Sequence, residues 1–321
     1  MKWVQWLLIA AAVSSMAATA SETTRIRVGV MAGGTLAWEL AAMRNEGLLS
    51  DSGLEVEAVT MANPQANKVA IQAGSVDMMI SDWIWVSGMR ADGSDLTFYP
   101  YSDVSGSLLV PKGSPIKALA DLKGKKLGVA GGELDKNWLL LRALAKQQGL
   151  DLAGSLETVY GAPPLLNQQM ASGRIDALLT YWQYAAPLEA QGYRQLLSGE
   201  EIIRQLGVAE SAPHMGYVFK AGWAKQHQAA LQRFFDLSKT ARNRLCDSDA
   251  AWQKVVSLIN ATEPAEQNQL RSRYCEGRVE DWNVAKRQAA EAVYQWLRKV
   301  GDSKLTGKAE HISDGTFWPA D

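Results

Sequence analysis

One phrase occurs twice in this chain at a spacing of 99 residues, and this repetition restricts the possible folds more than any other feature. The first copy, GSVDMMISDWIW, runs from Gly74 to Trp85, and the second, GRIDALLTYWQY, runs from Gly173 to Tyr184. Both contain a glycine, an aspartate three residues later, a short apolar run and a pair of aromatic residues two positions apart. Two copies of one strand-like phrase predict two structural units built on one plan.

A longer order of elements surrounds each copy. Residues 25–83 read as strand, helix, strand, helix and strand, and residues 124–182 repeat that order. A glycine pair follows the first strand of each series, and a proline follows the second strand. The βαβαβ order indicates parallel strands joined by right-handed crossovers. We therefore expect an α/β fold of two lobes, each a mostly parallel sheet flanked by helices.

Two extended stretches connect the predicted lobes. The first lies within residues 102–110, and the second, the return crossing, lies within 208–219. The sequence after the return crossing is helical by spacing, and we expect these helices to complete the first lobe. The predicted division assigns the first lobe to residues 21–103 and 215–321, and the second lobe to residues 104–214.

The charge balance argues against two classes of partner. The chain has 321 residues, with 33 basic and 34 acidic side chains and a formal net charge of −1. Nucleic acids and anionic membrane surfaces call for clustered Lys and Arg, and no such cluster occurs in this sequence. The length is sufficient for two packed cores.

The first twenty residues have the pattern of a cleavable signal peptide. Lys2 precedes an apolar stretch of residues 3–13, and small residues lead to Ala18-Thr19-Ala20. The apolar stretch is about half of the roughly 20 residues that a spanning helix needs. We expect a soluble, periplasmic mature protein without direct insertion into the membrane.

Cys246 and Cys275 are the two cysteines of the chain, with 28 residues between them. In an oxidising compartment an even pair of cysteines favours a disulfide, and two unpaired buried thiols are the alternative. No two of the three histidines have the spacing of metal ligands, so neither a metal nor another cofactor is expected.

The repeated aromatic pairs are the first candidates for a binding site. In open parallel sheets, ligands bind beyond the carboxyl ends of the strands. If the strands continue that far, Trp83 and Trp85 share one face, and so do Trp182 and Tyr184. Such rings suit stacking on a ligand or contact with a cation, and core or interface packing is the alternative.

Other candidates lie at the same predicted strand ends. Asp82 either binds a ligand or caps a helix, and Lys136 is the basic candidate at this edge. Glycines at the turns either leave N–H groups open to a ligand or serve the backbone alone. Asp77 and Asp176 open their strands, so we interpret them as structural. The remaining expected ligand-binding residues, some with a packing alternative, are Gly33, Gly34, Thr35, Trp38, Gly131, Gly132, Asp135, Tyr181 and His214.

Three segments resemble those of periplasmic solute-binding proteins of ABC importers. They are ALADLKGKKLGVAGG at 118–132, AIQAGSVDMMISDW at 70–83 and LNQQMASGRIDALLTYW at 166–182. Together they are similar to the family that binds aliphatic sulfonates, taurine, nitrate and thiamine precursors. The resemblance implies a two-lobed type II binding-protein fold that closes on a small molecule. It also implies a monomeric receptor that delivers its ligand to a membrane permease with a separate ATPase.

The ligand and the biological role stay open at this point. Aromatic side chains with acidic neighbours favour an amine or a nitrogen heterocycle, whereas the resemblance favours a sulfonate such as taurine. A periplasmic accessory or sensor protein, docking on a membrane kinase or a dehydrogenase, is the alternative role. An enzyme is not expected, because the chain lacks a G-x-S-x-G motif, a phosphate-binding loop and a metal-ligand cluster.

Overall fold

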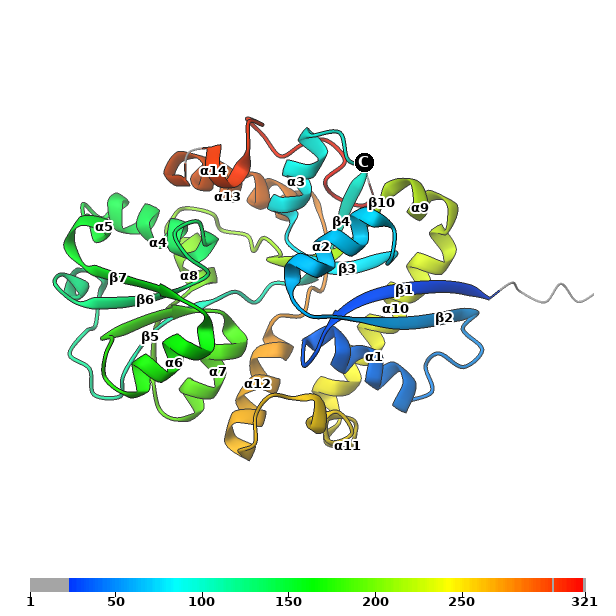
Figure 1. Cartoon of the computed structure of the whole chain (residues 1–321), viewed down its shortest axis with the longest axis horizontal. Coiled ribbons are helices and arrows are strands. Elements are labelled where there is room, and N and C mark those ends of the chain that lie inside the picture. The colour runs from blue at the N-terminus through cyan, green and yellow to red at the C-terminus, as the bar shows by residue number, and fades with distance from the viewer. Residues whose placement is uncertain (1–22, 302, 320–321) are drawn as a thin grey trace, which may run out of the picture.

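The computed structural model describes residues 23–301 and 303–319, so the predicted signal peptide lies outside the described residues. The strands form two five-stranded sheets, one in each half of the molecule (Figure 1). The first sheet has the order β2-β1-β3-β10-β4, with β1 (Thr24–Met31), β2 (Leu54–Met61), β3 (Met78–Ser81), β4 (Leu96–Ser102) and β10 (Met215–Lys220). The second has the order β7-β6-β8-β5-β9, with β5 (Ser107–Val110), β6 (Lys126–Ala130), β7 (Glu157–Gly161), β8 (Ala177–Thr180) and β9 (Arg194–Ser198).

Strand directions confirm the α/β fold with mostly parallel sheets. In the first sheet β2, β1 and β3 are parallel, and β10 is antiparallel to both β3 and β4. In the second sheet β7, β6 and β8 are parallel, and β5 is antiparallel to both β8 and β9. Each sheet therefore has a single reversed strand, and that strand follows a connection from the other lobe.

The helices flank the sheets in the order of the chain. Those of the first βαβαβ series are α1 (Thr35–Asn45), α2 (Pro64–Ala73) and α3 (Trp83–Ala91). Those of the second half are η1 (Leu119–Leu122), α4 (Lys136–Gln147), α5 (Leu152–Ser155), α6 (Pro163–Ala171), α7 (Trp182–Ala190) and α8 (Gly199–Gln205). The C-terminal part contains α9 (Ala221–Gln226), α10 (Gln228–Asp247), α11 (Asp249–Gln253), η2 (Val256–Leu258), α12 (Pro264–Glu276), α13 (Val284–Gly301) and α14 (Ser303–Thr306).

The two repeated aspartates have the same structural role in both lobes. Asp77 accepts a hydrogen bond from the backbone N–H of Arg27 at 2.8 Å, and its own N–H donates to the Arg27 carbonyl at 2.8 Å. Asp176 makes the same two contacts with Lys126, also at 2.8 Å. Each aspartate thus fixes the start of the third strand against the first strand of its lobe.

Within the described part of the chain, residues 103–106 and 206–214 run between the two sheets, and a third segment, residues 277–283, runs beside the first of them. The Asp103 N–H donates to the Gly277 carbonyl at 3.1 Å. A Cβ atom on Gly277 would lie 2.7 Å from the Ser102 hydroxyl oxygen, so the close approach of the third segment requires glycine there.

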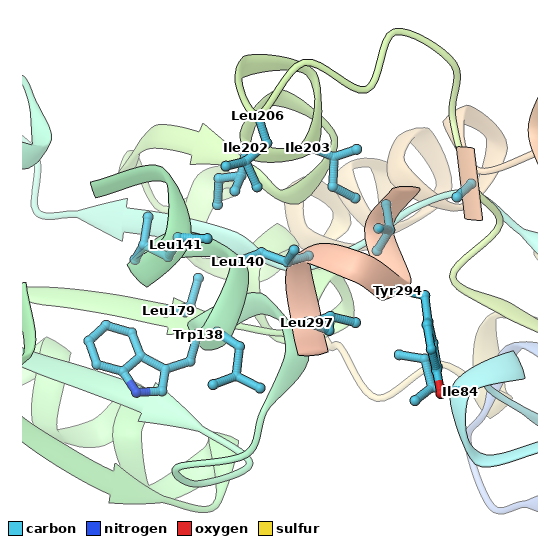
Figure 2. Close-up of a cluster of buried hydrophobic side chains, with 14 of the residues drawn as sticks. Ile84, Trp138, Leu140, Leu141, Leu179, Ile202, Ile203, Leu206, Tyr294 and Leu297 are labelled. Carbon is cyan, nitrogen blue, oxygen red and sulfur yellow. The ribbon is translucent and has the colours of Figure 1, made fainter. Parts of the chain in front are cut away.

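Helix α13 packs in a hydrophobic cluster to which both lobes contribute. Its apolar face packs along α4 of the second lobe, and the side chains of Leu297 and Tyr294 belong to one cluster with Trp138 and Ile84 (Figure 2). Ile84 lies on α3 of the first lobe, and Trp138 lies on α4. The C-terminal helices therefore do not pack against the first lobe alone.

A carboxylate without exposed surface lies at the centre of the first lobe. Glu39 on α1 accepts hydrogen bonds from Arg242 Nε at 2.8 Å, from the Tyr274 hydroxyl at 2.6 Å and from the Ser238 hydroxyl at 2.6 Å. The Arg242 guanidinium also lies 4.1 Å from the ring centre of Tyr101. This cluster joins α1, β4, α10 and α12.

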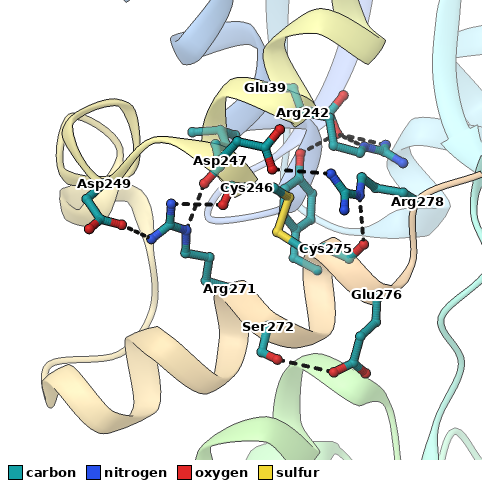
Figure 3. Close-up of a disulfide and its surroundings, with 12 residues drawn as sticks. Glu39, Arg242, Cys246, Asp247, Asp249, Arg271, Ser272, Cys275, Glu276 and Arg278 are labelled. Atoms are coloured by element: carbon teal, nitrogen blue, oxygen red, sulfur yellow. Dashed lines mark hydrogen bonds and ion pairs between the residues drawn. A yellow bond between two sulfur atoms is a disulfide. The ribbon is translucent and has the colours of Figure 1, made fainter.

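The predicted disulfide is present and reinforces the same helices. Cys246 at the end of α10 is bonded to Cys275 near the end of α12, with 5.7 Å between their Cα atoms (Figure 3). Arg271 on α12 donates to the carbonyls of Leu245 and Cys246 at 2.8 and 3.0 Å. The end of α10 is thus held by a covalent bond and by a cation that satisfies its last carbonyls.

We predict that Glu39→Gln destabilises the protein by about 3–5 kcal/mol, because the substitution leaves the Arg242 charge buried without its carboxylate. Urea denaturation of the purified variant measures this free energy of unfolding. Glu46→Gln is the matched control, since Glu46 pairs with half-exposed Lys254 at 2.7 Å and its loss is expected to cost less than about 1 kcal/mol. Equal losses in both variants would contradict the prediction.

Candidate functional site

Four helices begin at the carboxyl ends of the inner strands of the two sheets. Helices α1 and α3 follow β1 and β3 in the first lobe, and α4 and α7 follow β6 and β8 in the second. Parallel sheets place ligands at this edge. The candidate site is therefore built from two matching pairs of strand ends and helix starts.

The expected faces of the aromatic pairs are wrong, because the strands end earlier. Strand β3 ends at Ser81, and Trp83 is the first residue of α3. Asp82 is the N-cap and accepts a hydrogen bond from the Trp85 N–H at 2.9 Å, so the capping alternative is the one observed. Residues two positions apart point about 200° apart on a helix, so Trp83 and Trp85 do not share a face.

Trp83 packs in the core next to the return crossing. Its side chain is 3% exposed, its indole N–H donates to the Pro213 carbonyl at 2.9 Å, and its ring lies against Tyr294 and Phe317. Trp85 is half-buried, and the Lys68 ammonium lies 4.7 Å from its ring centre. Trp83 thus positions the crossing, and little of its surface is open to a ligand.

The second aromatic pair, Trp182 and Tyr184, lies in the first turn of α7. Trp182 is the first residue of α7, and its half-buried ring packs against a buried cluster that contains Ala186 of α7 together with residues of the first lobe. Tyr184 is half-buried, and its carbonyl accepts a hydrogen bond from the Asn167 amide at 3.1 Å. Trp182 therefore lies at the edge where the strands end, beside a cluster to which both lobes contribute.

Lys136 lies where both lobes and the return crossing meet. Its ammonium donates to the His214 carbonyl at 3.1 Å, and the charges of Asp82 and Asp135 act on it. Burial lowers the pKa of Lys136, and the two carboxylates counteract part of this effect. The ammonium thus brings together the first lobe through Asp82, the second through Asp135 and the crossing through His214.

Asp135 and Tyr181 form the second-lobe side of this contact. Asp135 caps α4 by accepting the N–H groups of Asn137 and Trp138 at 2.9 and 3.2 Å, and it is also hydrogen-bonded to the Tyr181 hydroxyl. Burial raises the pKa of Asp135, and burial together with Asp135 raises the pKa of Tyr181. Tyr181 therefore keeps its proton and donates to the carboxylate.

The glycine turns differ in how much space surrounds them. Gly131 has φ +88°, and a Cβ atom there would lie 2.3 Å from the Tyr181 hydroxyl, so a side chain would displace that group. Gly132 has φ +95° and open space beside it. In the first lobe, Gly33 is exposed, whereas Gly34 is half-buried and is the N-cap of α1, without a side chain to cap it.

The residues that follow Gly34 have separate roles. The Thr35 hydroxyl oxygen accepts a hydrogen bond from Tyr101 at 2.8 Å, and Thr35 is the first residue of α1. Trp38 is 3% exposed and packs edge-on against Trp252 and Tyr274. The structure therefore places Trp38 in the core and Thr35 at the strand-end edge.

Two polar residues at this edge were not found from the sequence. Asn137 and Thr180 are buried, and Asn137 Oδ1 and Thr180 Oγ1 have no hydrogen-bond partner among the described protein groups. Asn137 is packed between Gly106 and Gly199, beside the first crossing. Buried polar atoms require partners, so a ligand or a water molecule suits these two positions. Neither residue belongs to a motif that would have marked it.

A second contact between the lobes lies on the outer part of α7. Glu189 accepts hydrogen bonds from Arg273 at 3.0 and 2.9 Å and from Gln269 at 2.8 Å, and both partners lie on α12. Bidentate arginine–carboxylate pairs are among the stronger polar contacts. Helices α7 and α12 therefore hold the two halves together at a distance from Lys136.

Metal ligands and membrane spans are absent from the described ranges 23–301 and 303–319. There, no group of three or more His, Cys, Asp and Glu side chains is arranged to hold a metal ion. None of the helices within these ranges has the length and apolar composition that crossing a membrane requires.

The family model described as NMT1/THI5 like matches residues 37–248. A curated protein of Escherichia coli (strain K12), named for binding aliphatic sulfonates, is 34% identical over 146 residues. That alignment covers 44% of this chain and 44% of that protein, so the chain matches less than half the length of that relative. The resemblance to the sulfonate, taurine, nitrate and thiamine-precursor family is confirmed.

Solved structures share the fold over nearly the whole chain. The periplasmic aliphatic sulphonate binding protein SsuA from Escherichia coli has a TM-score of 0.72 at 19% identity, covering 92% of this chain and 97% of that one. The alkanesulfonate-binding protein SsuA from Xanthomonas axonopodis pv. citri, bound to MOPS, has a TM-score of 0.69 at 18% identity, covering 92% and 99%. The two-lobed fold is therefore that of these binding proteins.

We predict that His214 makes folding stability depend on pH. Burial, and then the Lys136 charge, hold the pKa of His214 well below its ordinary value. The unfolded chain therefore binds one more proton below about pH 6.5, and stability is lost as the pH falls. Between pH 7.5 and 5.5 the wild type should lose about 1.4 kcal/mol more than His214→Gln.

Urea denaturation at the two pH values measures this difference. His311→Gln is the control, because it removes an imidazole whose side chain is 76% exposed rather than buried. Identical pH dependence in the wild type and His214→Gln would show that the buried imidazole does not set it.

Proposed function

The chain belongs to the NMT1/THI5-like family, and on that premise we propose that it is the exported solute-binding receptor of an ABC importer. Its two lobes capture a small organic solute between the carboxyl edges of their sheets and close on it. The receptor then delivers the solute to a membrane permease, and a separate ATPase supplies the energy. The similar proteins are named for binding rather than for a reaction, which supports a role without catalysis.

The observation that carries this proposal is the position of Lys136. The ammonium is held by a carbonyl of the return crossing and lies within the influence of carboxylates from both lobes. A solute that contacts Lys136 therefore contacts the point at which the lobes turn relative to each other. Binding there favours one relative orientation of the lobes over others, which is how a ligand drives closure.

The proposed solute is a small organic sulfonate, with taurine as one member of this class. Neither the N-cap of α1 nor that of α7 uses a side chain to cap its helix, whereas Asp82 and Asp135 cap α3 and α4. Open helix N-termini are suited to anionic oxygens. The names of the similar proteins support the same class.

A cationic amine is less well supported at this edge. The carboxylates of Asp82 and Asp135 already interact with the Lys136 ammonium, and each also accepts N–H groups of the helix that it caps. Their negative charge is thereby partly compensated before any ligand arrives. In the proposed site, Lys136 and the starts of α1 and α7 hold the sulfonate. Thr35, Asn137 and Thr180 complete its polar surroundings.

We predict that Lys136→Gln weakens sulfonate binding at least tenfold, because a hydrogen bond from a charged donor typically contributes about 1.5–3 kcal/mol. Isothermal titration calorimetry with taurine and with ethanesulfonate measures the affinity. Lys123→Gln, at an exposed position of the same lobe, removes the same charge and should keep the wild-type affinity. If the wild type binds neither sulfonate, or if both variants bind equally well, the proposed ligand class is wrong.

A further inference from the structure

A cavity outside the strand-end edge lies between α4, α5 and α13. Its volume is about 620 Å³, which is within the range of small-molecule sites. Helices α4 and α13 are packed against each other (Figure 1), and residues of α5 also line the space between them. We call this space the α4–α13 groove. It does not include the residues of the site proposed above.

The lining of the groove has a surplus of positive charge. Arg142 and Lys146 of α4 and Lys299 of α13 line it, and Asp151 is its acidic residue, so the lining carries 3 − 1 = +2. Within the described part of the chain, none of the three cations forms an ion pair. Asp151 accepts the Gly154 N–H at 3.1 Å as the cap of α5. Like charges that line one groove repel one another, and an anion placed in the groove relieves that repulsion.

Apolar side chains, among them an indole ring, also line the groove. Trp296 is half-buried, and the Lys299 ammonium lies 4.9 Å from its ring centre. Leu150 and Val300 are also half-buried and add aliphatic surface beside the ring. A lining that combines apolar surface with cationic side chains matches a molecule with a flat or aliphatic body and a single anionic group.

We propose that the α4–α13 groove is a second binding site, for an organic anion with an apolar body. The anionic group lies among Arg142, Lys146 and Lys299, and the apolar body lies on Trp296. Because α13 packs on both lobes, an occupant of the groove also reinforces the contact between α13 and the second lobe. This site is separate from the strand-end edge and does not require that edge to bind a sulfonate.

Naphthalene-1-carboxylate, an aromatic anion outside the sulfonate class proposed for the strand-end edge, is the probe for a direct test by isothermal titration calorimetry. The Lys146→Gln/Lys299→Gln double variant should bind it at least tenfold more weakly than the wild type. The Lys146→Arg/Lys299→Arg variant should bind within about threefold of the wild type, because it keeps both charges. Lys123→Gln/Lys225→Gln removes the same total charge at two exposed positions elsewhere and should bind as the wild type does.

The outcome is independent of the strand-end site, because Lys136→Gln should leave groove binding unchanged while it weakens taurine binding. The proposal is overturned if the wild type does not bind the probe, or if the double glutamine variant binds it with wild-type affinity. It is also overturned if the Lys123/Lys225 control loses as much affinity as the groove variant. Loss of probe binding in Lys136→Gln alone would assign the probe to the strand-end edge and overturn the second site.

Discussion

The buried pair of Glu39 and Arg242 is the contact on which the first lobe depends. An unexposed carboxylate is tolerable only because a guanidinium, a phenol and a hydroxyl surround it. These partners lie on helices α10 and α12, between 199 and 235 residues after Glu39 in the chain. The same arginine lies over Tyr101, whose hydroxyl contacts Thr35 at the candidate site. The carboxylate of Glu39 therefore ties α1 to α10 through Arg242 and to α12 through Tyr274.

The two lobes share a backbone plan but not a set of side chains. Asp77 and Asp176 make the same contacts, which shows that the repeated phrase preserves the pairing of the strands. Five residues later the two copies differ in their contacts. Asp82 caps its own helix, whereas its counterpart Tyr181 reaches across to Asp135. This difference leaves the start of α7 without a side-chain cap and makes the two halves of the site chemically unequal.

Much of the fold could be predicted because strand alternation and the spacing of glycine and proline are local signals. The ends of the strands could not be predicted, because an aspartate after an apolar run can serve equally as a strand residue or as a helix cap. At Asp82, the structure shows the helix cap. Lys136 was predictable from its place after a glycine turn. Asn137 and Thr180 were not predictable, because their place in the candidate site follows from their burial, which no sequence motif marks. The amphipathic pattern of α13 showed an apolar face but not the two lobes that cover it.

The insertion of β10 between β3 and β4 has a consequence for the order of folding. All five strands of the second sheet are consecutive in the chain, from β5 to β9, so this sheet can assemble as soon as residue 198 has emerged during synthesis. The first sheet cannot, because the edges of β3 and β4 remain unpaired until residues 215–220 arrive. During that interval the N-terminal strands expose open edges, which are the part of a nascent chain most prone to aggregation. The first sheet is thus completed after the second, although its first four strands are made before it.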